Sequence, residues 1–158
     1  MPEKLHPSVQ KVTAALREAG AAGEVVVLED AAPTAVTAAA QLGCEVGAIA
    51  NSLIFDAGGE PLLVLTSGAH RVDTGLIAHL VGVSKVKRAT PEFVKAATGQ
   101  TIGGVAPVGH PAPIRTLVDT WLAKHPVVWA AAGHAHTVFP TTFEELVRIT
   151  GGTPADVE

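Results

Sequence analysis

Residues 99–110 read Gly99-Gln100-Thr101-Ile102-Gly103-Gly104-Val105-Ala106-Pro107-Val108-Gly109-His110, and the rest of the chain is organised around them. The four glycines of this stretch lack a Cβ atom, so their backbone N–H groups can come close to a ligand. Pro107 fixes its own φ angle and restricts Ala106 before it. We therefore predict that the stretch forms a backbone-built wall of a pocket. The alternative is an ordinary connection whose glycines serve only turns.

Helical and strand patterns alternate on the N-terminal side of this stretch. Helical spacing of apolar residues predicts helices over 7–19, 35–42, 74–80 and 91–97. Thr34, Asp73 and Thr90 are suitable N-caps for the last three. Strands are expected over 25–28, 48–55, 61–66 and 85–88, and the turn at 56–59 joins two of them into a hairpin. The basic strand 85–88 has the composition of a solvated sheet edge.

On the C-terminal side the pattern is less regular. Residues 114–121 fit a strand or a helix equally well. Strands are expected over 127–131 and 137–139, and the capping box that begins at Thr141 predicts a last helix reaching Ile149. The tail after Thr153 is expected to be loose. Without a repeat or linker, the sequence predicts one mixed α/β (α+β) domain over residues 1–158.

The composition narrows the classes of function. Of the 158 residues 47% are hydrophobic and 16% charged, so a packed core is expected and disorder is not. Only 4% are aromatic, which disfavours a stacking surface for single-stranded nucleic acid. The net charge of −4 disfavours a protein that grips a long phosphate backbone, although it permits binding of one nucleic-acid end.

The single cysteine, Cys44, allows neither an intramolecular disulfide nor a cysteine zinc cluster. No signal peptide is recognised at the N-terminus, and no apolar run has membrane-spanning length. We therefore expect a soluble cytoplasmic protein that does not bind membranes.

Common catalytic signatures are missing from the sequence. Four late histidines, with Asp119, are the only candidates for a metal site, but their spacing matches no known ligand pattern, so no metal or cofactor is predicted. There is no Gly-x-Ser-x-Gly elbow, and no Gly-Lys-Ser/Thr follows the glycines as in a phosphate-binding loop.

Several segments in the same order resemble the YbaK and prolyl-tRNA synthetase-associated editing domain family. They are residues 34–43, 49–55 (Ile-Ala-Asn-Ser-Leu-Ile-Phe), 68–73, 86–92, 98–99, 103–109, 118–119 and 132–133. The resemblance implies a curved mixed sheet or pseudo-barrel with helices packed outside. It also implies a trans-editing aminoacyl-tRNA deacylase, which hydrolyses the ester between a wrong amino acid and the 3′ end of a tRNA, typically tRNA for proline. The implied partners are that 3′ end and prolyl-tRNA synthetase.

In the family the Gly-x-x-x-Pro loop, here Gly103 to Pro107, lies beside the ester. Hydrolysis by water needs an oriented water and donors for the developing oxyanion, and backbone N–H groups can be those donors. The residues predicted to be catalytic are Asn51, Gly103, Gly104 and Asp119. The residues predicted to bind substrate are Thr34, Ser52, Ser67, Arg71, Pro107, His110, Gly133 and His134. Small lining residues would select a small amino acid such as alanine or cysteine by exclusion.

Asn51 departs from the family pattern, in which a lysine is common at this position. Asparagine keeps a donor but loses the positive charge that could hold a phosphate or ribose. One interpretation is an active enzyme with different selectivity. The others are a weak or inactive relative that binds an aminoacyl-adenosine-like or nucleotide ligand, and a module that docks on a synthetase.

Overall fold

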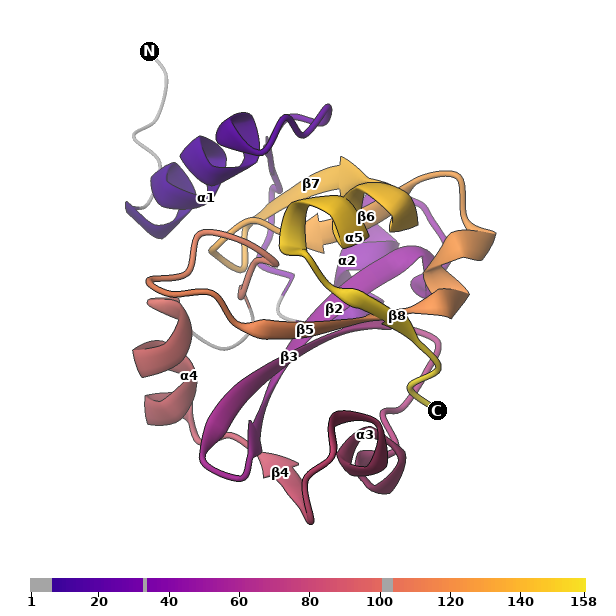
Figure 1. Cartoon of the computed structure of the whole chain (residues 1–158). Helices are drawn as coiled ribbons and strands as arrows, with labels where there is room; N and C mark the ends of the chain where they lie inside the picture. Colours follow the sequence, from indigo (N-terminus) through magenta and orange to yellow (C-terminus); the bar gives the residue numbers. More distant parts are fainter. Residues whose placement is uncertain (1–6, 33, 101–103) are drawn as a thin grey trace.

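The computed structural model describes residues 7–32, 34–100 and 104–158, and the chain within them forms one mixed sheet with helices around it (Figure 1). The helices are α1 (Pro7–Glu18), α2 (Ala35–Leu42), α3 (Thr74–Val81), α4 (Pro91–Thr98) and α5 (Phe143–Thr150), with 3₁₀ turns η1 (Val46–Ala48) and η2 (Thr120–Lys124). The strands are β1 (Val26–Val27), β2 (Ile49–Ala57), β3 (Glu60–Ser67), β4 (Val86–Arg88), β5 (Arg115–Asp119), β6 (Val128–Ala131), β7 (Thr137–Thr141) and β8 (Thr153–Ala155).

The strands follow the order β1-β7-β6-β2-β3-β5-β8, and β4 pairs with β2 outside this path. The hairpin β2–β3 is antiparallel, whereas β2–β6, β3–β5 and β5–β8 are parallel. This arrangement confirms the expected mixed α/β fold. Among the described residues no helix is both long and apolar enough to cross a membrane.

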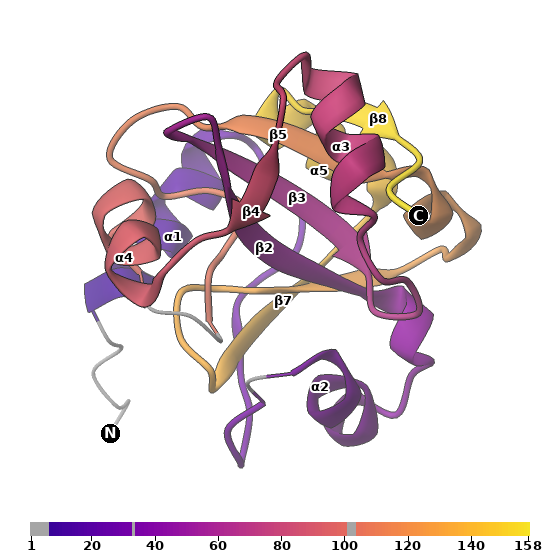
Figure 2. The same cartoon turned by 90° about the horizontal axis from the view of Figure 1, so that it is seen from below.

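Alternating side chains of β2 supply two different parts of the core. Ala50 and Ile54 pack in a cluster with residues of α1, α4 and α5, whereas Phe55 and Ala57 pack in a cluster with α3. A third, smaller cluster joins α2 to Ile49. Figure 2 shows α3 and α4 on different sides of the β2–β3 hairpin, and α2 at the bottom of the view. The central strand is therefore held on both faces, as its period of two requires.

The helix caps predicted at Thr34, Asp73 and Thr90 are confirmed, whereas the last helix is capped by Thr142, one residue after the predicted Thr141. The side chains of Thr34, Asp73, Thr90 and Thr142 each accept a hydrogen bond from the first turn of their helix. Four helices end at a glycine in the left-handed conformation, as in Gly43 after α2.

The structure resolves the ambiguity of residues 114–121 and corrects the prediction for the C-terminal tail. The undecided residues 114–121 divide into β5 and η2, because the Asp119 side chain accepts a hydrogen bond from Trp121 N and so ends the strand in a turn. The expectation of a loose tail is wrong. Residues 153–155 form β8 beside β5, and Val157 is fully buried in the cluster with α3.

Candidate active site

The sheet has a gap along one edge of β2. One edge of β2 pairs with β3 over residues 50–57. On the other edge β6 pairs with 49–50 and β4 with 55–57, and no described strand pairs with residues 51–54 there. Gly68 N donates to Ile49 O, so the peptide groups of Ile49 face β3. Because these directions alternate along a strand, the N–H and C=O groups of Ser52 and Ile54 face the gap.

A cavity of about 270 Å³ occupies this gap. It is bounded by β2, by Arg88 at the end of β4 and Ala89 after it, by residues 129–131 of β6 and by the start of α2. Much of its wall consists of small side chains: Ala32, Ala35, Ala38, Ala50, Ala89, Ala130 and Ala131. The volume lies just below the range of sites that enclose a drug-sized ligand. The cavity can therefore enclose a small group and leave the remainder of a larger molecule outside.

Four predicted site residues line this cavity: Thr34, Asn51, Ser52 and His134. Thr34 is committed to the cap of α2, where its hydroxyl accepts from Thr37 N at 3.2 Å. His134 Nδ1 accepts from the backbone N of His136 at 3.2 Å, which fixes the ring orientation. The hydroxyl of Ser52 is the one buried side-chain polar atom without a hydrogen bond among the described residues.

Arg88 is a lining residue that the sequence interpretation missed. It pairs with Phe55 in register and forms one side of the cavity, yet its side chain is exposed and makes no hydrogen bond or ion pair with the described residues. The neighbouring Lys87 instead lies 4.0 Å from Asp56, measured between Nζ and Oδ2. The composition of 85–88 predicts a solvated edge, and only the pairing of this segment with the apolar strand β2 places a cation beside the cavity.

Residues 104–108 of the glycine-rich stretch are buried instead of standing open. Gly104 is buried, and its carbonyl accepts from Gly133 N at 2.9 Å. A Cβ on Gly104 would lie 2.6 Å from the carbonyl carbon of His134, so only glycine fits against this backbone. The buried Gln100 side chain accepts from Ala106 N at 2.7 Å and donates to Val108 O at 3.3 Å.

The remaining predictions on this stretch fare differently. Gly103 lies outside the described residues, so the prediction about it stays a prediction. Val105 lines the cavity, whereas the buried Pro107 is not among the lining residues. Among the described residues of the stretch, Val105 alone lines the cavity, so the predicted backbone-built wall stays a prediction.

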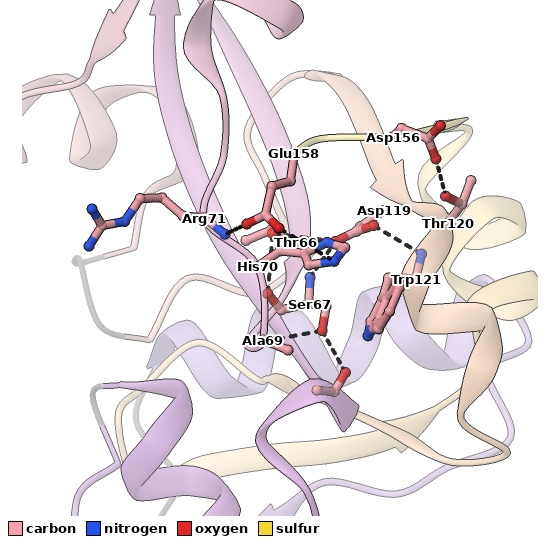
Figure 3. A network of polar contacts seen from close by, with 11 residues as sticks. Thr66, Ser67, Ala69, His70, Arg71, Asp119, Thr120, Trp121, Asp156 and Glu158 are labelled. Atoms are coloured by element: carbon pink, nitrogen blue, oxygen red, sulfur yellow. Dashed lines mark hydrogen bonds and ion pairs between the residues drawn. The ribbon is translucent and has the colours of Figure 1, made fainter.

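Asp119, Ser67 and Arg71 come together elsewhere, in a polar cluster at the end of β3 (Figure 3). Asp119 is buried; its Oδ2 accepts from Ser67 N at 2.9 Å and lies 2.8 Å from His70 Nδ1. Arg71 contributes its backbone N, which donates to Glu158 at 2.6 Å, while its side chain is exposed. None of these residues lines the cavity. Their contacts tie β3, β5 and the C-terminal residues together.

His110 lies in a second cleft of about 150 Å³ beside α1, lined also by Ser8, Lys11 and Thr98. Its Nε2 donates to Ala106 O at 2.8 Å. Burial lowers the pKa of His110, and this hydrogen bond opposes the shift only in part. In the described part of the chain, no three His, Cys, Asp or Glu side chains are placed to hold a metal ion.

Comparisons with known proteins agree on one family. Residues 29–149 match the family model of the aminoacyl-tRNA editing domain. Proline–tRNA ligase of Nitratidesulfovibrio vulgaris (strain DP4) is 32% identical over 116 residues, which cover 73% of this chain but only 19% of the ligase. The chain therefore spans about a fifth of that curated relative.

Two relatives of similar length complete the comparison. The uncharacterised protein YwhH of Bacillus subtilis (strain 168) is 28% identical over 124 residues, 78% of each chain. The crystal structure of a candidate trans-editing enzyme for prolyl-tRNA synthetase superposes with a TM-score of 0.92 at 41% identity, covering 98% of this chain and 99% of the other.

Proposed function

This chain belongs to the aminoacyl-tRNA editing domain family, and on that premise we propose that it is a trans-editing deacylase acting in the cytoplasm. Its proposed substrate is a tRNA for proline that carries a small wrong amino acid such as alanine or cysteine. The observation that carries the proposal is the small, alanine-walled cavity in the gap of β2. Association with prolyl-tRNA synthetase would bring the protein to its substrate.

The proposed reaction is attack by water on the ester carbonyl. The C–O bond to the ribose breaks, the ribose oxygen takes a proton, and free amino acid and tRNA leave. No aspartate, glutamate, lysine or cysteine is found among the described lining residues, so water held by the substrate and by neutral groups is the proposed nucleophile. The N–H groups of Gly103 and Gly104 are the proposed donors to the oxyanion. Loss of one such donor raises the activation free energy by about 2.7–4 kcal/mol.

We assign the terminal phosphate of the tRNA to Arg88. This residue supplies an exposed guanidinium, without a salt bridge to any described residue, at one side of the cavity, where it can replace the charge that Asn51 lacks. A guanidinium binds phosphate through two parallel hydrogen bonds. Asn51, which also lines the cavity, is proposed to bind the ribose.

Size selection follows from the wall of the cavity. An additional methylene gains only about 1–3 kcal/mol as an attraction, so exclusion is the effective way to reject larger amino acids. The alanines of α2 and β6 leave space for a small side chain, and enlarging any of them would shrink it.

The deciding experiment is single-turnover hydrolysis of tRNA for proline charged with alanine, cysteine, serine, threonine or proline. We expect release of one or more small amino acids and no release of proline. Arg88→Gln should lower the affinity for charged tRNA, whereas Arg17→Gln, which removes an exposed arginine from α1, should not. A protein that binds the aminoacyl end without hydrolysing any of the five would instead be the inactive relative.

A further inference from the structure

We propose that Ser52 binds the α-ammonium group of the aminoacyl moiety, and that the site therefore distinguishes a free amino group from a neutral one. The inference rests on the proposed function for the identity of the ligand. It concerns a contact that hydrolysis alone does not reveal.

The structure leaves Ser52 with unused acceptors. Its hydroxyl is buried and makes no hydrogen bond with the described residues, which costs stability unless a ligand completes it. Its backbone carbonyl faces the gap in which no described strand pairs with residues 51–54. Ser52 lines the cavity, so these two oxygens are the acceptors that it offers there. An ammonium group has three N–H donors to offer them.

The other lining groups make poorer partners for a cation. No carboxylate occurs among the described lining residues, so the ammonium must be bound by neutral oxygens. The Thr34 hydroxyl is occupied in the cap of α2, and the Thr137 hydroxyl donates to His134 O at 3.0 Å. Asn51 precedes Ser52 on the strand, so its side chain lies on the opposite face of β2. Ser52 is the remaining hydroxyl.

Charge separation supports this placement. Arg88 pairs with Phe55, three residues along β2 from Ser52, which corresponds to about 10 Å of strand. The backbone positions of Ser52 and Arg88 are therefore separated along the strand, which leaves room for an ammonium at one end of the cavity and a phosphate at the other. The phosphate of the terminal nucleotide, at the other end of the same substrate, is drawn towards Arg88.

Two stable amide ligands test the proposal without requiring turnover: 3′-alanylamino-3′-deoxyadenosine and its 3′-lactylamino counterpart, in which a hydroxyl replaces the ammonium. Dissociation constants would be measured by calorimetric titration. We expect the wild type to prefer the alanyl ligand at least about tenfold, as for a hydrogen bond to a charged group. Ser52→Ala should weaken the alanyl ligand about tenfold and the lactyl ligand less than about threefold.

Controls separate the contact from the fold. Ser84→Ala removes an exposed serine outside the cavity and should change neither constant. Ser52→Ala should melt no lower than the wild type, because it removes an unpaired buried hydroxyl; Ser52→Cys provides a second variant of similar size. Equal weakening of both ligands, or a wild type that prefers neither or binds neither, would overturn the inference. Preference for the ammonium without hydrolysis of charged tRNA would support it and refute the proposed function.

Discussion

Replacing Gly104 by alanine should lower the melting temperature although the residue lies in a loop. The added Cβ would meet three backbone atoms: the carbonyl carbon and Cα of His134 at 2.6 and 2.7 Å, and Ala135 N at 2.8 Å. Ordinary contacts of a Cβ begin at 3.4 Å, so the two segments must separate by about 0.8 Å. Overpacking of this kind costs about 1–3 kcal/mol. For a chain of this size that corresponds to about 2–12 °C.

Scanning calorimetry of Gly104→Ala beside Gly47→Ala measures this effect. Gly47 is also buried, but a Cβ there would meet only side-chain atoms, His125 Nε2 at 3.1 Å and Ala69 Cβ at 3.5 Å. The control should therefore melt closer to the wild type. Because the displaced His134 lines the cavity, Gly104→Ala should also reduce deacylation per folded molecule. A variant that melts within about 2 °C of the wild type would refute the packing argument.

Three further predictions concern single residues. Asn51→Ala should slow single-turnover deacylation about tenfold, because a hydrogen bond to a phosphate or ribose is worth about 1.5 kcal/mol. Asn51→Lys should match or exceed the wild-type rate. Unchanged rates in both variants would remove the residue from the site. Burial lowers the pKa of His110, so the unfolded chain binds the proton more readily and the free energy of unfolding should fall as the pH drops below about 6.5. Urea titrations from pH 8 to 5 should show a shallower fall for His110→Gln, and an identical slope would contradict this. Asp119→Asn should lower the free energy of unfolding by about 1.5–3 kcal/mol, because the carboxylate accepts hydrogen bonds from Ser67 and His70. The affinity of the cavity for the alanyl ligand should not change. Loss of that affinity in the folded variant would return Asp119 to the catalytic residues.

Local chemistry explains why most helices could be predicted from the sequence. A hydroxyl or carboxylate at Thr34, Asp73 or Thr90 accepts from an N–H group three residues away, and a glycine ends the helix in a conformation that other residues avoid. Both interactions depend on neighbours in the chain, so they can be recognised without knowledge of the fold.

Distant partners explain the misses. Residues 153–155 form a strand only because β5 lies beside them, and β5 itself ends where Asp119 caps the following turn. Neither the pairing nor the burial of Val157 is visible in a short polar tail. The periodicity of 114–121 was ambiguous for the same reason.

In the candidate site too, residues marked by their local sequence were predictable, whereas residues placed by distant strand pairing were not. The polar residues Asn51 and Ser52 were recognisable because they interrupt an apolar strand, and both line the cavity. Asp119 was equally conspicuous, yet its partners are Ser67, His70 and Trp121, which form a cluster outside that lining. Arg88 escaped notice because its position depends on the pairing of β4 with β2.

The interrupted edge of β2 also bears on how such a protein can change its selectivity. The cavity lies where β2 lacks a neighbouring strand among the described residues. Its length along β2 is set by the residues at which β6 and β4 pair with that strand. Loops can vary without altering this spacing. Substitutions at Ala35, Ala38 or Ala130 reshape the interior, while the strands on either side keep their register. Mutational libraries restricted to these alanines should therefore yield folded proteins with altered amino-acid preference more often than libraries directed at the connecting loops.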